Sequence, residues 1–464
     1  MKEDMQSDYE EMKPLEHHKR RAMMTLRWVI FAVFSGIVIG AAGAVFHKII
    51  DAVTEARTGH PQLLLLLPLG AVFILLLYGR FGEGTEGGTN LILTSIRGQK
   101  TVPLRLAPLI FIATTVSHLA GASVGREGAA LQLGGSLGHF IGEMFHFSAR
   151  DKKTLVMTGM SAAFSAMFGT PLAAAVFPME VVSVGIMHFS ALLPCTIAAL
   201  IARGVAIKMG ASAPYYDLGV IPGVGILPML QVFLLAALAG FLAAAFCFLL
   251  QRSEHLTEKV LKNAYIRAAV IGAAVLMLTY LSGGQTYNGA GSSYISVCIE
   301  GQSASYSFLM KILITVLSIC AGYKGGEIVP SFFIGASFGC FVGSFLALPP
   351  GLCAAIGMGA VFCGVTNSPI SSFIIMCEMF GFEGAPYYLL GCAVSYVVSG
   401  YYGLYTGQKI VYSKYRLNHI DRDTLSRVLP CARRVWKRQE QRNRFAEQRR
   451  DRRNDEILYA GKCI

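Results

Sequence analysis

Long uncharged stretches, separated by short polar segments, run through most of the chain. A helix needs about 17–25 apolar residues to cross the hydrocarbon of a bilayer, and most of these stretches are that long. In order they are 28–46, 61–78, 106–124, 154–179, 181–202, 226–250, the weaker 268–281, and 385–408. The pattern predicts an all-α polytopic membrane protein.

One further uncharged run, residues 328–377, is too long for two ordinary spans. Pro349 and Pro350 lie in its middle, and proline interrupts a helix because it lacks an N–H and clashes with the preceding turn. The run also contains seven glycines. Glycine and proline at membrane depth are tolerated where the backbone is buried in protein or lines a cavity. We therefore expect short, tilted and broken helices here.

The composition supports a membrane protein and adds no sign of a cofactor. Hydrophobic residues make up 54% of the chain and charged residues 15%, against about 25% charged in soluble proteins. This disfavours a disordered chain, a secreted disulfide scaffold and a nucleic-acid-binding domain. The 11 cysteines are scattered, without a C-x-x-C pair, so we expect no metal and no cofactor. We also expect no cleavable signal at the N-terminus.

Basic residues flank the first and last spans. Lys19, Arg20 and Arg27 precede the first span, whereas Lys409 and Lys414 follow the last. Because basic loops stay in the cytoplasm, we expect both termini there, in a plasma membrane of the bacterial inner-membrane type. Residues 417–464 hold 13 Lys/Arg against 7 Asp/Glu. We interpret this tail as a solvated segment near anionic lipid rather than a nucleic-acid site.

The chain contains an internal repeat. Residues 120–142 and 321–343, at an offset of 201, are identical at eight of 23 positions, and further matches at an offset of 198 include Glu180 with Glu378. Such repeats are typical of secondary transporters, whose halves pack around a central site. We predict a cytoplasmic segment (1–22), two membrane repeats (23–210 and 211–416) and the basic tail (417–464).

The repeated segments break at glycine-rich turns that each precede an apolar helix. The first turn is Gly125-Arg126-Glu127-Gly128, and the second runs from Gly325 to Pro330. Free backbone N–H groups and the helix dipole make a helix N-terminus an anion site. Glu127 and Glu327 lie in these turns, where a carboxylate either caps its helix or competes with a transported anion for the amides. Because ionisable groups at membrane depth are candidates for function, we favour competition for Glu127.

These segments resemble those of the CLC family of chloride channels and proton-coupled anion antiporters, over about residues 25–416. The most specific elements are G-R-E-G-A at 125–129, the segment 326–330 and G-Q-K-I-V-Y-S at 407–413. The resemblance implies a CLC-type inverted repeat, a homodimer with one pore per subunit, and Glu127 as the gating glutamate. It also implies an anion pathway formed by Gly88, Thr89, Asn90, Gly125, Arg126, Gly128, Gly326, Ile328, Val329 and Tyr412, with Tyr412 donating its hydroxyl to the central anion.

Three departures from the chloride-transporting pattern resemble a fluoride-exporting subclass of CLC antiporters. The first anion loop, 84–90, lacks the chloride-coordinating serine and the proline. Glu327 replaces an apolar residue, and the internal proton-transfer glutamate corresponds to Val181. A protonated Glu327 would donate a strong hydrogen bond to fluoride, which is tightly hydrated. Val329 departs from the threonine expected in that subclass.

Other functions remain open at this stage. A chloride/proton antiporter would need an acid at Val181, and a passive chloride channel would not couple its gate strictly to protons. A membrane-embedded enzyme has only Glu143 and His146 as a candidate metal pair, too few ligands for a catalytic site. The expected partners are therefore fluoride or chloride, protons, lipid and a second subunit, without nucleic acid.

Overall fold

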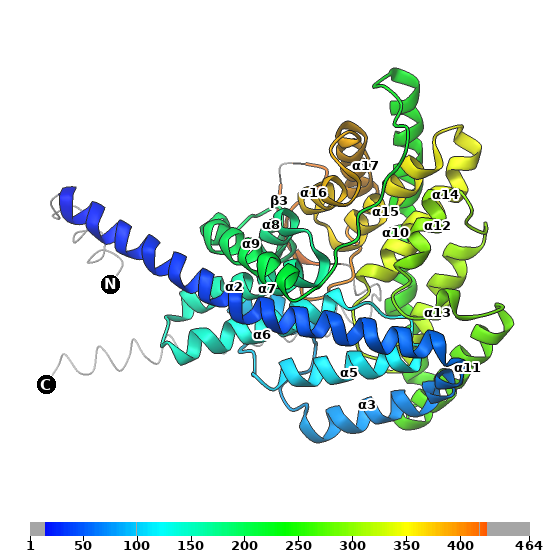
Figure 1. The fold of residues 1–464 in the computed structure, drawn as a ribbon, viewed down its shortest axis with the longest axis horizontal. Helices are drawn as coiled ribbons and strands as arrows, with labels where there is room; N and C mark the ends of the chain where they lie inside the picture. The colour runs from blue at the N-terminus through cyan, green and yellow to red at the C-terminus, as the bar shows by residue number, and fades with distance from the viewer. Residues whose placement is uncertain (1–13, 99, 417, 425–464) are drawn as a thin grey trace, which may run out of the picture. The chain divides into compact units, whose positions relative to one another are not determined.

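A computed structural model describes residues 14–98, 100–416 and 418–424. Most of the predicted N-terminal segment and basic tail therefore lies outside the described residues. The described part is a body of closely packed helices in which the long helix α2 (Pro14–Gly59) packs along α5, α7 and α9 (Figure 1).

Within the described residues the α-helices form two consecutive series of eight, one in each repeat. After α2, the first series continues with α3 (Leu67–Phe81), α4 (Thr89–Ile96), α5 (Leu106–Ala120), α6 (Glu127–Met144), α7 (Ala149–Phe168), α8 (Pro171–Val181) and α9 (Leu192–Lys208). The second comprises α10 (Ile226–Val260), α11 (Ala264–Leu281), α12 (Ser293–Ile299), α13 (Ser307–Cys320), α14 (Ile328–Leu346), α15 (Pro350–Thr366), α16 (Pro369–Phe380) and α17 (Ala385–Val398). Short 3₁₀ turns lie at Pro61–Leu66, Phe189–Ala191 and Gln285–Tyr287.

Six of the described helices are long and apolar enough to cross a membrane, which agrees with the predicted class. The 50-residue uncharged run is broken as predicted: α14 ends at Leu346, Pro349 caps α15, and α16 begins at Pro369.

Several predicted spans are wrong in detail. Residues 154–179 form two helices, because Gly169 takes a left-handed conformation (φ 80°) and Pro171 starts α8. The stretch 181–202 is not one span either, since a loop follows the end of α8 before α9 begins. In the stretch 385–408, α17 ends at Val398. Helix α13 was missed because buried Lys311 interrupts its apolar sequence.

Glycine pairs bring α6 into close contact with α7 in the first repeat and α14 into close contact with α15 in the second. A Cβ added to Gly134 of α6 would overlap the carbonyl of Gly159 in α7, and one added to Gly335 of α14 would overlap that of Gly357 in α15. Equivalent glycines thus serve the same packing in both repeats, which explains why they gave the clearest repeat signal in the sequence.

The two repeats also cap each other's helices. The carboxylate of Glu180, at the end of α8, accepts hydrogen bonds from the backbone N–H of Ile370 (3.0 Å) and Ser371 (2.8 Å) and from the Ser371 hydroxyl (2.6 Å). Glu378 of α16 accepts in turn from the N–H groups of Leu172 and Ala173, both at 2.9 Å. Each glutamate therefore satisfies the free amides at the N-terminus of the other repeat's helix.

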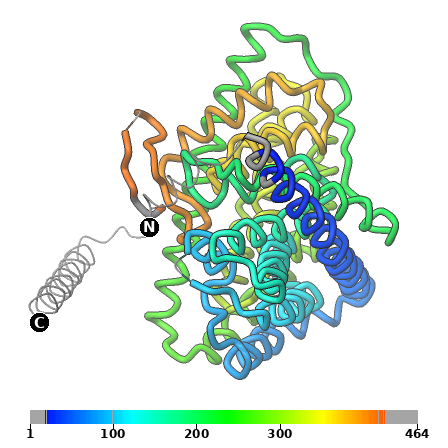
Figure 2. Tube along the Cα trace, turned by 90° about the vertical axis from the view of Figure 1, so that its left-hand side faces the viewer, coloured from blue at the N-terminus to red at the C-terminus, as the bar shows by residue number. Residues whose placement is uncertain are grey.

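A small sheet lies beside the helices. Strand β1 (Ser183–Val184) pairs in parallel with β2 (Lys409–Tyr412), which pairs antiparallel with β3 (His419–Asp423). The orange hairpin of β2 and β3 lies at the edge of the helical body (Figure 2).

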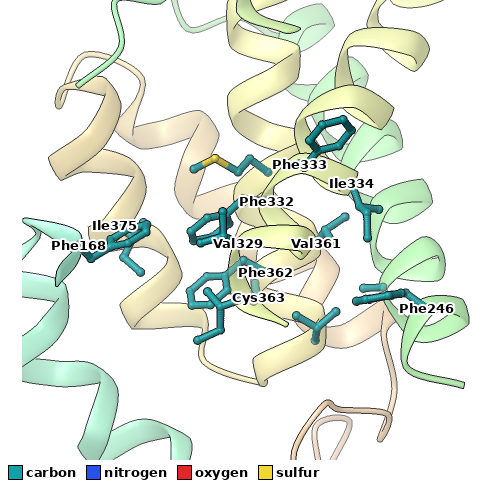
Figure 3. Close-up of a cluster of buried hydrophobic side chains, with 14 of the residues drawn as sticks. Phe168, Phe246, Val329, Phe332, Phe333, Ile334, Val361, Phe362, Cys363 and Ile375 are labelled. Carbon is teal, nitrogen blue, oxygen red and sulfur yellow. The ribbon is translucent and has the colours of Figure 1, made fainter. Parts of the chain in front are cut away.

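Aromatic side chains fill the centre between the two repeats. The ring of Phe332 in α14 lies 5.4 Å from that of Phe168 in α7 and 4.9 Å from that of Phe362 in α15 (Figure 3). Phe164 and Phe177 continue the cluster on the side of the first repeat. This core supports the first turn of α14, where the second glycine-rich break ends.

The reciprocal caps lead to a stability prediction. Glu180→Ala leaves two amides at the start of α16 and the buried Ser371 hydroxyl without their partner, so we expect the free energy of unfolding to fall by about 1–3 kcal/mol. Glu180→Gln keeps an acceptor oxygen and should lose less. Thermal unfolding of the purified protein measures both, and equal stability of the alanine variant and the parent would contradict the capping role.

Candidate ion pathway

The two glycine-rich turns meet face to face and form the centre of the candidate pathway. Gly125 N–H donates to the Gly326 carbonyl (2.5 Å), and Gly326 N–H donates to the Gly125 carbonyl (2.6 Å). These residues are equivalent at the repeat offset of 201, so the pair joins matching points of the two repeats. Helix α6 begins two residues after one glycine, and α14 two residues after the other.

Only glycine fits at this junction. A Cβ on Gly128 would lie 2.7 Å from Cα of Gly326, and a Cβ on Gly325 would lie 2.6 Å from Cβ of Val124. Any larger residue would push the turns apart and break the paired hydrogen bonds. The predicted pathway residues Gly125, Gly128 and Gly326 are therefore brought together by the structure.

Glu127, the first residue of α6, is 1% exposed. Its Oε2 accepts a hydrogen bond from Arg126 N–H (3.0 Å), and Oε1 lies 3.6 Å from Nε of the same arginine. The carboxylate thus occupies the free-amide end of its own helix, which is the place that the sequence predicts for an anion.

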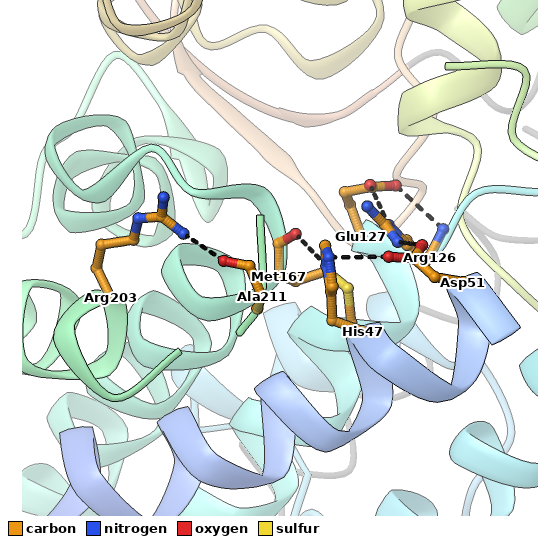
Figure 4. Close-up of polar contacts among 7 residues, drawn as sticks. All are labelled: His47, Asp51, Arg126, Glu127, Met167, Arg203 and Ala211. Carbon is orange, nitrogen blue, oxygen red and sulfur yellow. Dashed lines mark hydrogen bonds and ion pairs between the residues drawn. The ribbon is translucent and has the colours of Figure 1, made fainter. Parts of the chain in front are cut away.

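A chain of charged side chains leads away from Glu127 (Figure 4). The guanidinium of Arg126 also pairs with Asp51 of α2, and the other Asp51 oxygen lies 3.0 Å from Nε2 of His47. Nδ1 of His47 lies 3.1 Å from the Met167 carbonyl and must donate to it, because a carbonyl only accepts.

Glu127 lines a cavity of about 280 Å³, which we call the Glu127 cavity. His47, Asp51 and Arg126 are among its polar lining residues, which also include four serines, and Val329 and Phe332 of α14 contribute apolar side chains. The predicted residues Arg126 and Val329 both reach this cavity. Ile328 is fully buried and lines neither this cavity nor the next.

Glu327, the N-cap of α14, lines a different and larger cavity of about 660 Å³, the Glu327 cavity. The two cavities share no lining residue. The two candidate carboxyls, one on the first residue of α6 and one at the N-cap of α14, thus face separate spaces.

The first anion loop lines the Glu327 cavity. Gly88, Thr89 and Asn90 all line it, and Gly88 has φ 52° and ψ −118°, a conformation that suits glycine. The Thr89 hydroxyl accepts from Gln132 of α6 (3.1 Å). Asn90 Oδ1 accepts from Gly407 N–H (2.8 Å), which fastens this loop to the segment after α17.

Tyr412 does not lie on the pathway. It belongs to β2, is 43% exposed and packs against His419. Tyr405 instead lines the Glu327 cavity; it is 2% exposed, and its hydroxyl has no hydrogen-bond partner among the described residues. Tyr405, and not the predicted Tyr412, is thus the tyrosine that lines this cavity, and the sequence marks it only by its place in a glycine-flanked turn, G-L-Y-T-G.

The position expected for an internal proton-transfer acid holds no titratable side chain. Val181 is fully buried at the end of α8, and its carbonyl accepts from Gln408 (2.9 Å). The neighbouring Glu180 is occupied by the amides of α16. Among the described residues, no group of three or more His, Cys, Asp or Glu could hold a metal ion.

Comparison with known proteins places this arrangement in a family. Residues 70–400 match the family model described as voltage gated chloride channel, or CLC. The chain belongs to the CLC family. A chloride/fluoride channel protein of Pseudomonas syringae pv. tomato is 34% identical over 84% of this chain and 88% of its own length. The H(+)/Cl(−) exchange transporter ClcA of Vibrio cholerae is 25% identical over 76% of this chain and 81% of its own.

Solved CLC structures have the same fold. The crystal structure of a CLC-type fluoride/proton antiporter superimposes with a TM-score of 0.80 at 30% identity, covering 82% of this chain and 98% of the other. That of a slow cyanobacterial Cl⁻/H⁺ antiporter gives 0.72 at 19% identity, over 80% and 94%. The chain is thus a multi-pass membrane protein with the CLC inverted repeat.

The corrected tyrosine gives a matched pair of variants. Tyr405→Phe removes the unpartnered hydroxyl from the Glu327 cavity, so we expect the anion concentration for half-maximal flux in proteoliposomes to rise about 2–10-fold, as for the loss of one hydrogen bond. Tyr412→Phe, at an exposed strand, should leave it unchanged. The opposite ranking of the two variants would exclude Tyr405 from the pathway.

Proposed function

We propose that this CLC protein is a fluoride/proton antiporter, a secondary transporter and not an enzyme, that uses the proton gradient to export fluoride. The observation that carries the proposal is the pair of carboxyls at the central junction. Glu127 and Glu327 lie at the N-termini of α6 and α14 and face separate cavities. Two carboxyls that face separate cavities close to one junction can carry both the proton and the competition with an anion.

Glu127 acts as the gate. In its ionised form it occupies the amide end of α6 beside Arg126 and blocks an incoming anion. Protonation from the Glu127 cavity removes the charge that binds it there, so the side chain can leave and an anion can take its place. Because the anion and the carboxylate use the same donors, each fluoride that moves out requires a proton to move in.

Glu327 supplies the selectivity for fluoride. An ionised carboxylate repels an anion, whereas a neutral carboxyl donates a strong hydrogen bond. Fluoride gives up its water only for such donors. The Tyr405 hydroxyl, on the same cavity, adds a second donor.

The absence of an acid at Val181 suits this cycle. A chloride/proton antiporter of this family is expected to move protons through an internal glutamate at that position, apart from its anions. Here the proton and the fluoride share one route through Glu127, and a one-for-one exchange needs no second route. One relative, at 34% identity, is named a chloride/fluoride channel protein, and a solved structure, at 30% identity, is a fluoride/proton antiporter; both names support fluoride as a transported ion.

Val329 favours the alternative of a chloride/proton antiporter or chloride channel. Its apolar side chain lines the Glu127 cavity and offers no hydrogen bond where a strongly hydrated ion would pass. Chloride, which is larger and less strongly hydrated, would need fewer donors there. Comparison of fluoride and chloride efflux from the same vesicles decides between these functions.

We further propose that the protein works as a homodimer in a bacterial inner membrane, with one pathway in each subunit and both termini in the cytoplasm. Crosslinking in membranes tests the dimer, and cysteine labelling of the termini tests the orientation.

Substitution of the gate tests coupling. Glu127→Gln cannot be ionised, so we expect an imposed pH gradient to no longer drive fluoride out of proteoliposomes. A fluoride electrode and a pH electrode record both ions together. Glu143→Gln, at the exposed end of the same helix, is the control and should behave as the parent. Proton-driven fluoride efflux at the parent rate from Glu127→Gln would refute the proposed gate.

Two substitutions of Glu327 separate hydrogen bonding from titration. Glu327→Gln keeps an N–H donor, whereas Glu327→Ala removes it. We expect the alanine variant to lose the preference for fluoride over chloride by about tenfold or more, the effect of a hydrogen bond to a charged group, and the glutamine variant to retain most of it. Equal selectivity of both variants and the parent in the efflux assay would make Glu327 structural only.

A further inference from the structure

A third cavity lies beside the Glu127 cavity and contains an unneutralised cation. Its volume is about 380 Å³, and we call it the Arg57 cavity. It shares five lining residues with the Glu127 cavity, among them Asp51 and Arg126, so the two spaces adjoin. Arg57, His118 and Gln285 line only the new cavity.

Arg57 is 3% exposed, yet its Nε and Nη1 have no hydrogen-bond partner among the described residues. Backbone surrounds the side chain: a Cβ on Gly121 would lie 3.3 Å from Arg57 Cδ, and one on Gly289 would lie 3.1 Å from Nη1. The guanidinium is thus held between two glycine-containing turns at the wall of the cavity, with two of its nitrogens unpartnered among the described residues.

Further basic groups surround the same space. His118 of α5 is 1% exposed, and neither of its ring nitrogens has a partner among the described residues. Fully buried Lys311 lies behind the turn, donating from Nζ to the carbonyls of Tyr287 (3.0 Å) and Gly289 (2.8 Å).

The one acidic residue among those that line the Arg57 cavity is Asp51, and Arg126 and His47 already engage both of its oxygens. Arg57 lies in the last turn of α2, where the helix dipole offers about half a negative charge. A buried guanidinium needs more than that, because an isolated buried charge is costly. Its planar donors suit an anion.

We propose that the Arg57 cavity is a second anion site, which binds a small inorganic anion, a halide, between the free donors of Arg57 and an N–H of His118. A neutral imidazole still has one N–H to donate. The cavity adjoins the gate through Asp51 and Arg126. We therefore assign the halide a waiting role, in which it occupies the Arg57 cavity before or after exchange at Glu127. Only this waiting role rests on the proposed antiport function; the binding site does not.

Stability in different salts tests the site directly. Thermal unfolding is followed in gluconate and then in equimolar sodium fluoride or chloride, for the parent, Arg57→Gln and the control Lys48→Gln, which removes an exposed charge from the same helix. We expect halide to raise the Tm of the parent and the control by about 2–4 °C more than that of Arg57→Gln. Halide bound at the central junction would raise the Tm of all three proteins equally, so its effect cancels when the variants are compared.

An equal rise in Tm in all three proteins would refute the halide site. The helix dipole alone would then stabilise the charge of Arg57. Should Arg57→Gln fail to fold, His118→Leu, which removes one donor, replaces it; a halide response equal to that of the parent would then overturn the proposal.

Exchange of radioactive fluoride across proteoliposomes, at equal concentration on both sides, tests the waiting role. We expect Arg57→Gln to raise the half-saturating fluoride concentration about tenfold, since one charged hydrogen bond is lost, with the maximal rate unchanged. An unchanged half-saturation would refute the waiting role. If the parent itself shows no fluoride exchange, the proposed function fails, while the stability measurement still decides whether the halide site exists.

Discussion

Two backbone hydrogen bonds between Gly125 and Gly326 determine where everything else in the pathway lies. They join equivalent residues of the two repeats, so they bring the N-termini of α6 and α14 to one place, from opposite halves of the chain. Because these bonds use the glycine N–H and C=O groups, the amides that follow in each turn stay free for an anion or a carboxylate. The constraint is steric as well as polar, since Gly325 and Gly128 leave no room for a side chain.

The Glu127 cavity and the Glu327 cavity share no lining residue, although Glu127 and Glu327 each lie within two residues of the Gly125–Gly326 pair. In the proposed cycle the movement of a single carboxyl suffices for exchange, and the helices need not move as bodies. The rigid surroundings agree with that picture, because glycine contacts lock α6 to α7 and α14 to α15, and Glu180 and Glu378 tie α8 and α16 together.

The sequence reveals those parts of the structure in which repeated glycines allow close contact between backbones. The repeat, the breaks at Gly125 and Gly326 and the interruption at Pro349 were all predictable, because a close backbone approach leaves glycine or proline in the sequence. Other parts depend on contacts between distant residues. Buried Lys311 hides α13 from a hydropathy pattern, since its partners are carbonyls some twenty residues away. Likewise, Tyr405 and Tyr412 are both aromatic residues near glycine, and only the fold shows which of them faces the cavity.

Buried charges in this protein fall into two groups, and the difference points to ligands. Glu180 and Lys311 are buried, and each has at least two hydrogen-bond partners. Arg57 is just as buried, but two of its three guanidinium nitrogens have no partner among the described residues. An acidic side chain that paired with Arg57 would stabilise the protein in the same way as the partners of Glu180 and Lys311 do. An acidic side chain beside Arg57 would occupy the position that the proposed halide takes. An anion site therefore requires a guanidinium that no acidic residue of the protein neutralises.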